Sequence, residues 1–217
     1  MDDKKFDEKT AQEWIRIIED RSANVREKDL YPLLQSWLTT ASSKNVLDIG
    51  CGQGVCSIQT GQNQISYFGV DPSPDLIARA TELYANSSRT FVIGNAYALP
   101  FEDTYFDAVF SIAVWHLLSD LKKASYELSR VLKHKGHFLI FTADPYQYQI
   151  WMDRYVDEKL NGRHFTGSYQ ITDGSTVTDQ FYLHSLQDIT SALGAHGLEV
   201  STVETMRSFV VILGHKQ

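Results

Sequence analysis

The stretch VLDIGCGQG, residues 46–54, decides how the rest of the chain is interpreted. An apolar strand runs directly into a turn with glycines at positions 50, 52 and 54. Because glycine lacks a Cβ atom, such a turn can adopt positive φ angles and bring its backbone N–H groups close to a ligand. In open α/β sheets, ligands bind at the carboxyl ends of the strands. The stretch therefore predicts a ligand-binding turn after the first strand of an α/β sheet.

A nicotinamide dinucleotide is the first ligand to consider, because its binding turn has a similar pattern. Its fingerprint places glycines at relative positions 1, 3 and 6, which correspond here to residues 50, 52 and 55. Residue 55 is valine, and the third glycine stands at position 54 instead. This departure counts against a nicotinamide-dependent oxidoreductase, which stays open as an alternative.

Around this turn, short apolar runs alternate with segments of helical periodicity. The runs are NVLDI (45–49), ISYFGV (65–70), TFVI (90–93), FDAVFSI (106–112) and HFLIFT (137–142). Apolar runs without polar alternation are typical of strands buried on both faces. Strands that alternate with helices along the sequence form βαβ units and a parallel sheet.

The order of elements changes after residue 142. We expect six further elements there: a helix over 146–160, hairpin strands near 165–171 and 176–183, a helix that begins at Ser185, and strands near 198–204 and 208–213. The last two strands are joined by a short connection, so they are expected to be antiparallel. The complete pattern predicts an α/β Rossmann-like fold: a seven-stranded mixed sheet with helices on both faces and the last strand antiparallel.

The composition argues against several function classes. The net charge is −7, and the stretch between Lys44 and Lys122 holds eight acidic but only two basic residues. Nucleic-acid surfaces need clustered Lys and Arg, so we expect no nucleic-acid partner. No apolar run approaches the roughly 20 residues of a membrane span. The charged N-terminus is unlike a secretory signal, so we expect a cytoplasmic protein without a membrane partner.

The cysteine and histidine spacing indicates no metal site. The chain has two cysteines, Cys51 and Cys56, and no Cys/His pattern of a zinc site. Nothing in the sequence near either cysteine indicates a lowered thiol pKa. We therefore expect both to be small buried hydrophobic side chains.

Five segments, taken in order, carry a more specific pattern than the glycine turn alone. They are LDIGCGQG (47–54), YFGVD (67–71), GNAYALPF (94–101), FDAV (106–109) followed by WHLL (115–118), and LSRVLKHKGH (128–137). In this order they resemble the motifs of the class I S-adenosylmethionine-dependent methyltransferases. The small-molecule branch, with its ubiquinone/menaquinone-type methyltransferases, is the most similar, and the resemblance extends from about Lys44 to the C-terminus.

The resemblance implies the residues that bind S-adenosylmethionine. It places the carboxylate of Asp71 against both ribose hydroxyls, with a surface helix cap as the alternative role. Asp48 would orient the turn or hold the amino-acid end of the cofactor, and a purely structural role is nearly as plausible. The implied cofactor-binding residues are Asp48, Gly50, Gly52, Gly54, Asp71, Pro72, Asn95, Ala96 and Ser111.

Asn95 departs from the family pattern, in which an aspartate usually accepts the adenine amino group. The side-chain carbonyl of Asn95 can still accept that hydrogen bond, and the backbone N–H of Ala96 can serve a ring nitrogen. We therefore expect adenine recognition to persist in weakened form. The departure is also the one feature that favours a non-catalytic binding protein as an alternative function.

Two histidines are candidate catalytic residues. His116 follows the fourth predicted strand, near the place where a methyl group would be delivered, and a general base is its proposed role. A hydrogen-bonded core histidine beside Trp115 is an equally good interpretation of the same residue. His164 lies in the aromatic-rich segment 145–184 and is a secondary candidate.

The resemblance implies transfer of a methyl group from S-adenosylmethionine to an oxygen, nitrogen or carbon of a small molecule. We expect one domain, residues 1–217, active as a monomer or homodimer. It would comprise an N-terminal helical cap (1–44), a cofactor-binding half (45–142), a substrate-lid insertion (143–184) and a final helix and strands (185–217). Tyr31 or Arg21 of the cap is expected near the cofactor carboxylate.

Overall fold

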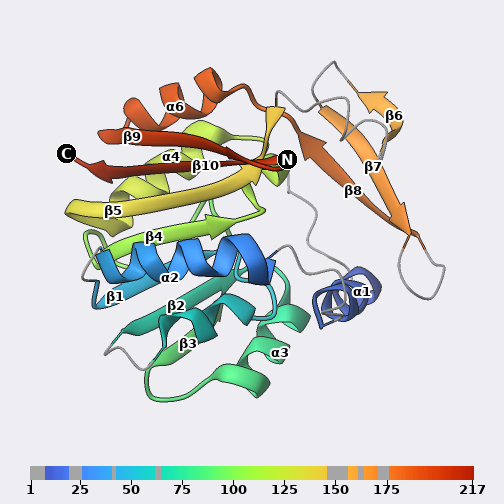
Figure 1. Ribbon diagram of the computed structural model, residues 1–217. Coiled ribbons are helices and arrows are strands. Elements are labelled where there is room, and N and C mark those ends of the chain that lie inside the picture. Colours follow the sequence, from blue (N-terminus) through green and yellow to red (C-terminus); the bar gives the residue numbers. More distant parts are fainter. Residues whose placement is uncertain are drawn as a thin grey trace.

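The computed structural model describes residues 8–19, 26–40, 43–61, 65–145, 156–160, 164–170 and 176–217. Their core is a seven-stranded sheet with the order β3-β2-β1-β4-β5-β10-β9 (Figure 1). The strands are β1 (Asn45–Ile49), β2 (Ser66–Asp71), β3 (Arg89–Ile93), β4 (Phe106–Ile112), β5 (Leu132–Ala143), β9 (Leu198–Met206) and β10 (Phe209–Lys216).

The strand directions match the mixed sheet predicted from the sequence. β1 pairs in parallel with β2 and β4, and parallel pairing continues from β2 to β3 and from β4 to β5. β10 is antiparallel to both of its neighbours, β5 and β9. The Rossmann-like fold with an antiparallel last strand is confirmed.

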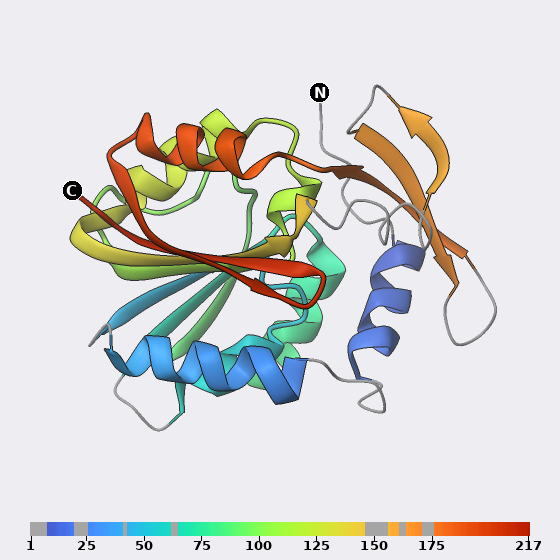
Figure 2. The same cartoon turned by 45° about the horizontal axis from the view of Figure 1, so that its top comes forward.

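Helices cover both faces of the sheet (Figure 2). One face carries α2 (Tyr31–Thr40), the 3₁₀ helix η3 (Val55–Thr60) and α3 (Pro74–Tyr84), whose apolar residues join one hydrophobic cluster. The other face carries α4 (Leu121–Val131) and α6 (Leu186–Gly194), which join the second cluster. Two cores on one sheet explain the continuous apolar runs of its central strands. None of the described helices is long and apolar enough to cross a membrane.

Helix ends follow the capping signals in the sequence. Ser73 caps α3 by accepting a hydrogen bond from the Leu76 N–H, and Pro74 occupies the first helical position. Ser185 and Asp188 form a reciprocal capping box at the start of α6. The sequence also predicts a helix that opens at Ser119-Asp120, runs through about Leu132 and is closed by Gly136. Asp120 caps α4, which ends at Val131, and β5 begins at the next residue, so Gly136 lies within the strand.

A second, three-stranded antiparallel sheet stands beside the main one (Figure 1). It consists of β6 (Val156–Leu160), β7 (His164–Gln170) and β8 (Thr176–Tyr182), and we call it the β6–β8 sheet. The predicted hairpin of β7 and β8 is confirmed. The helix expected over 146–160 is wrong at 156–160, because pairing with β7 makes these residues a strand. Residues 146–155 lie outside the described residues.

Two helical segments precede β1, as predicted. α1 (Glu8–Glu19) packs through Ala11 and Ile15 against Leu76 at the start of α3. A π-helical turn, η2 (Arg26–Leu30), leads directly into α2. The sequence also predicts a break between the two helices near residues 22–24, which lie outside the described residues. α1 is thus the N-terminal element closest to the glycine turn.

Candidate cofactor-binding site

The glycine turn links the ends of β1 and β2. Gly50, Gly52 and Gly54 have φ angles of 76°, 54° and 78°, all in the left-handed region that favours glycine. The N–H groups of Gly50 and Cys51 both donate to the carbonyl of Val70, at 2.8 and 3.0 Å. The turn is therefore fixed at the carboxyl edge of the sheet, where the sequence predicted a ligand site.

The three glycines differ in their surroundings. A Cβ atom at Gly50 would overlap Val114, and one at Gly54 would lie 2.7 Å from the ring of Phe91. At Gly52 the nearest atom of the described residues would be Nε1 of Trp14, at 3.6 Å, and no other atom of these residues lies within 4 Å. Packing thus requires the outer two glycines, whereas the middle one leaves room for a ligand beside the backbone.

Asp71 ends β2 and holds the turn. Its Oδ2 accepts the N–H of Gly52 at 2.9 Å, and its Oδ1 accepts the N–H of Ser73 at 2.9 Å. Burial raises the pKa of Asp71 to about 6, although the hydrogen bonds from Ser73 and Gly52 act in the opposite direction. The cap of α3 is Ser73 and not Asp71, so the alternative role of Asp71 as a helix cap is not what the structure contains.

Asp48 lies beneath the turn and is buried. Its Oδ2 accepts a hydrogen bond of 2.6 Å from the hydroxyl of Tyr67 on β2. This contact fits the structural role considered for Asp48, because it joins β1 to β2 below the glycines. Both cysteines are buried as expected, and burial together with the nearby Asp48 and Asp71 raises the pKa of Cys51.

Gln53 was not singled out from the sequence, yet it joins the turn to α1. Its buried side chain donates from Nε2 to the carbonyl of Ile15 at 3.1 Å. Its Oε1 is buried and has no hydrogen-bond partner in the described part of the structure. An unpaired buried acceptor beside a glycine turn is compatible with a ligand that brings its own donors.

The end of β3 lies next to Asp71, because the Gly94 N–H donates to the Asp71 carbonyl at 3.1 Å. Asn95 follows and is exposed, and its Oδ1 accepts the N–H of Tyr97 at 2.9 Å. Ala96 is buried between them. One lone pair of the Asn95 carbonyl oxygen is thus used within the loop, and the second is left for a ligand.

Ser111 has a supporting position. Its side chain is fully buried on β4 and donates to the carbonyl of Ile49 at 2.9 Å. The hydroxyl therefore fixes the last residue of β1 before the turn. Pro72 lies between Asp71 and the cap of α3 and is half-buried. Tyr31 packs against the cluster of α2, and Arg21 lies outside the described residues.

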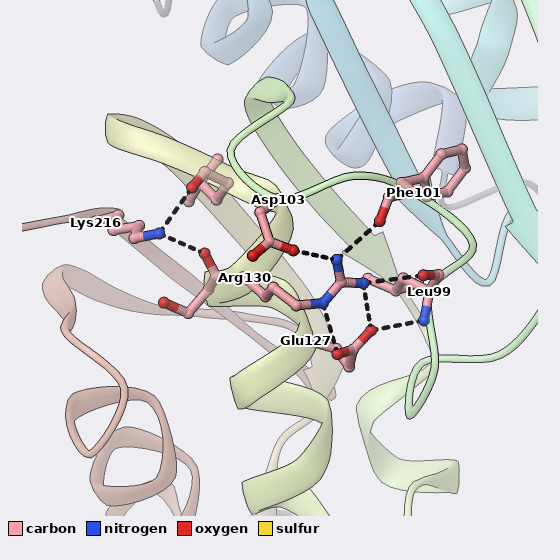
Figure 3. A network of polar contacts seen from close by, with 8 residues as sticks. Leu99, Phe101, Asp103, Glu127, Arg130 and Lys216 are labelled. Atoms are coloured by element: carbon pink, nitrogen blue, oxygen red, sulfur yellow. Dashed lines mark hydrogen bonds and ion pairs between the residues drawn. The ribbon is translucent and has the colours of Figure 1, made fainter.

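An ion-pair network holds the loop that follows Ala96 (Figure 3). The guanidinium of Arg130 on α4 bonds the carboxylate of Glu127, the carbonyls of Leu99 and Phe101, and the carboxylate of Asp103, all within 2.7–2.9 Å. Glu127 also accepts the N–H of Leu99 at 2.7 Å. α4 therefore fixes the backbone between residues 99 and 103 by side chains alone.

We expect Arg130→Met to lower the free energy of unfolding by about 2–4 kcal/mol. The substitution leaves the nearly buried Glu127 carboxylate without its cation and two loop carbonyls without a donor. Chemical denaturation of both proteins measures this loss. Asp103→Asn is the matched control, because it weakens only an exposed pair and should change stability by less than about 1 kcal/mol. Equal losses in the two variants would contradict this account.

His116 lies in η4 (Trp115–Leu117), the 3₁₀ turn after β4. Its Nδ1 accepts the N–H of Ala143 at 3.5 Å and lies 3.2 Å from Oγ1 of Thr142. Because a backbone N–H can only donate, the neutral ring carries its proton on Nε2. Burial, and secondarily the charge of His184, lowers the pKa of His116 to about 4. His116 is therefore neutral at pH 7, with its ring proton on Nε2.

His184 was not among the candidate residues, and its geometry is complementary. Its Nε2 lies 2.7 Å from the carbonyl oxygen of Leu118, which can only accept, so Nε2 carries the proton. The lone pair of the neutral ring is then on Nδ1. No sequence signal marked His184, because its partner is a backbone carbonyl 66 residues away.

The β6–β8 sheet meets η4 through aromatic rings. Phe181 of β8 stacks on His116 with centroids 5.8 Å apart. His164 stacks on Tyr182 at 4.2 Å, and Tyr182 is parallel to His184 at 5.9 Å. His164, the secondary catalytic candidate, does not itself stack on His116, and this ring stack connects it to His184.

Within the described residues, no cluster of three or more His, Cys, Asp and Glu side chains is arranged to hold a metal ion. Residues 47–140, which contain the glycine turn, Asp71 and Asn95, match the family model of a methyltransferase domain. The chain carries a methyltransferase domain. A solved structure of an amino pentose methyltransferase from Micromonospora echinaspora, which contains bound S-adenosylmethionine, has a similar fold, with a TM-score of 0.71 at 14% identity over 94% of this chain and 96% of that one.

Curated relatives of the methyltransferase domain share part of their length with this chain. An uncharacterized methyltransferase of Mycobacterium tuberculosis is 29% identical over 149 residues, which are 68% of this chain and 55% of the relative. A fatty-acid O-methyltransferase of Mycolicibacterium smegmatis is 32% identical over 120 residues, which are 54% of this chain and 44% of the relative. The chain thus spans about half the length of the relatives that it matches.

A solved structure shows the same fold. An S-adenosylmethionine-dependent methyltransferase from Clostridium acetobutylicum superposes with a TM-score of 0.74 at 13% identity. The superposition covers 94% of this chain and 98% of that one. The similarity of fold therefore extends well beyond residues 47–140.

Proposed function

We propose that the protein transfers a methyl group from S-adenosylmethionine to a small-molecule acceptor. The observation that carries the proposal is the buried carboxylate of Asp71, bonded to the glycine turn where the ends of β1 and β2 meet. A buried carboxylate is a strong acceptor for paired hydroxyl groups. At the same carboxyl edge of the sheet, the space beside Gly52 lies on one side of Asp71 and the exposed Asn95 lies on the other.

The residues of this edge suit the parts of the cofactor. Asp71 would accept the two ribose hydroxyls, Asn95 and the Ala96 N–H would bind the adenine edge, and the backbone at Gly52 would approach the amino-acid end. The Oε1 of Gln53 is a further acceptor close to that end. When bound, S-adenosylmethionine supplies a methyl group on a positively charged sulfur, which is the electrophile.

On the acceptor side we assign different roles to the two histidines. His116 would donate from Nε2 to an electronegative atom of the acceptor and so orient it. His184, whose Nε2 proton is fixed on the Leu118 carbonyl, would receive a proton at Nδ1 where the acceptor has one to lose. The aromatic rings of the β6–β8 sheet would exclude water. The fatty-acid substrate in the name of one relative supports a small-molecule acceptor.

Isothermal titration with S-adenosylmethionine and S-adenosylhomocysteine tests the proposal, followed by methyl transfer to a panel of small acids, alcohols and amines. We expect dissociation constants on the order of micromolar. Titration with NADH serves as the control ligand and should give no heat. Cofactor binding without turnover on any acceptor would favour the non-catalytic binding protein, and no binding would refute the proposal.

The affinity for S-adenosylhomocysteine should fall as the pH drops below about 6. Ribose hydroxyls bond the ionised carboxylate better, so binding requires the loss of the proton that Asp71 holds below a pKa of about 6. Affinity is thus complete above this pKa and decreases by up to about tenfold per pH unit below it. Titrations between pH 5 and pH 8 check this, and Asp71→Asn should flatten the profile. An unchanged profile in that variant would contradict the assignment.

A further inference from the structure

One peptide group joins the cofactor side of the molecule to the β6–β8 sheet. The carbonyl of Leu118 accepts the Nε2 proton of His184 at 2.7 Å. The N–H of the next residue, Ser119, donates to the hydroxyl oxygen of Tyr97 at 2.8 Å. The C=O of one residue and the N–H of the next belong to the same planar unit. Tyr97 and His184 therefore bond the two ends of a single peptide group.

The geometry of this group suits a bridge between two elements. No cis peptide bond occurs in the described residues, so the C=O and N–H of this unit point in opposite directions. Each hydrogen bond polarises the peptide and strengthens the other one. A shift of Tyr97 or of His184 therefore changes the strength of the hydrogen bond that the other residue makes. Tyr97 also accepts the N–H of Asp120 at 3.3 Å, which fixes its hydroxyl at the start of α4.

Each end of the bridge continues into a part of the proposed site. On one side, the Tyr97 N–H donates to the side chain of Asn95, the candidate adenine contact. On the other side, the His184 ring is parallel to Tyr182, which in turn stacks on His164 of β7. The contacts are continuous from the loop after β3 to the first residue of β7.

We propose that Tyr97 and His184 are positioning residues that couple cofactor binding to the placement of the β6–β8 sheet. This inference rests on the proposed function, because it takes Asn95 as a cofactor contact. A ligand that holds Asn95 steadies the Tyr97 loop, and the Leu118–Ser119 peptide passes that restraint to His184 and β8. Cofactor binding then orders the sheet that covers the acceptor.

Hydrogen–deuterium exchange of the full chain, with and without saturating S-adenosylhomocysteine, tests the coupling. In the wild type we expect the ligand to slow exchange of the β8 amides by at least about threefold. Tyr97→Phe and His184→Met should each abolish this slowing while leaving the dissociation constant within about threefold. Because both residues act through one peptide, the double variant should behave like either single variant.

Two controls separate coupling from a general loss of structure. Tyr126→Phe removes a tyrosine hydroxyl from an exposed position on α4 and should keep the slowing. His184→Gln retains an amide N–H donor near the position of Nε2 and should restore part of it. Slowing that persists in Tyr97→Phe and in His184→Met, or binding without slowing in the wild type, would overturn the inference. Absence of binding in the wild type would refute the proposed function and the inference together.

Discussion

Asp71→Ala is expected to weaken the binding of S-adenosylhomocysteine by about 100-fold or more. Two hydrogen bonds from ribose hydroxyls to a carboxylate contribute about 1.5–3 kcal/mol each, and alanine removes both. The variant also removes the acceptor of the Gly52 N–H, so the turn loses a restraint at its most open glycine. Isothermal titration of both proteins, with melting curves to verify folding, measures the change.

The control for Asp71 is Glu102→Gln. Glu102 is an exposed acid that follows the loop of Asn95, so its loss changes the net charge equally without touching the turn. The affinity of Glu102→Gln for S-adenosylhomocysteine should stay within about twofold of the wild type, since exposed charges interact weakly. If Asp71→Ala bound the ligand as tightly as Glu102→Gln, the carboxylate would be a part of the fold and not of the site.

Gly50→Ala should destabilise the protein by about 2–5 kcal/mol. The residue has a φ of 76°, which costs a non-glycine residue about 1–2 kcal/mol. Its new Cβ would also overlap Val114, and such overpacking adds about 1–3 kcal/mol. Denaturant unfolding gives the total loss.

Two further variants divide this loss into its parts. Gly197 has a similar φ of 72°, but a Cβ atom there would have no atom of the described part of the chain within 4 Å, so Gly197→Ala should show the backbone strain alone. In a double-mutant cycle, Val114→Ala should remove the overlap and leave Gly50→Ala about as costly as Gly197→Ala. A loss at Gly50 that Val114→Ala does not reduce would show that the packing of η4 on the turn is unimportant.

The parts of the fold that could be predicted are those encoded by neighbouring residues. Apolar runs gave the five parallel strands, and Ser73 followed by Pro74 gave the start of α3. β6 could not be predicted in this way. Its sequence, VDEKL, is rich in charged residues, and its extended form depends on pairing with β7.

The residues of the candidate site also differ in whether neighbouring residues in the sequence reveal them. Gly50, Gly54 and Asp71 could be proposed as site residues because each belongs to a short motif of adjacent residues, 47–54 or 67–71. His184 was missed because its partner is a backbone carbonyl 66 residues away, and every residue has such a carbonyl. Arg130 was missed because, besides its ion pairs with Glu127 and Asp103, it holds two loop carbonyls 29 and 31 residues away. His116 was expected to be a general base. The Ala143 N–H donates to its Nδ1, which is the nitrogen with the lone pair, so this nitrogen is already used within the protein.

The position of β10 has a consequence for synthesis on the ribosome. β10 pairs with β5 from Ala143 to His137, but it is made more than 60 residues later, after the β6–β8 sheet, α6 and β9. Until Phe209 and the residues after it emerge, β5 has an unpaired edge that can pair with other chains. The late closure of this edge is a long-range step that slows folding. A nascent chain halted before residue 209 should therefore be a preferred substrate for chaperones.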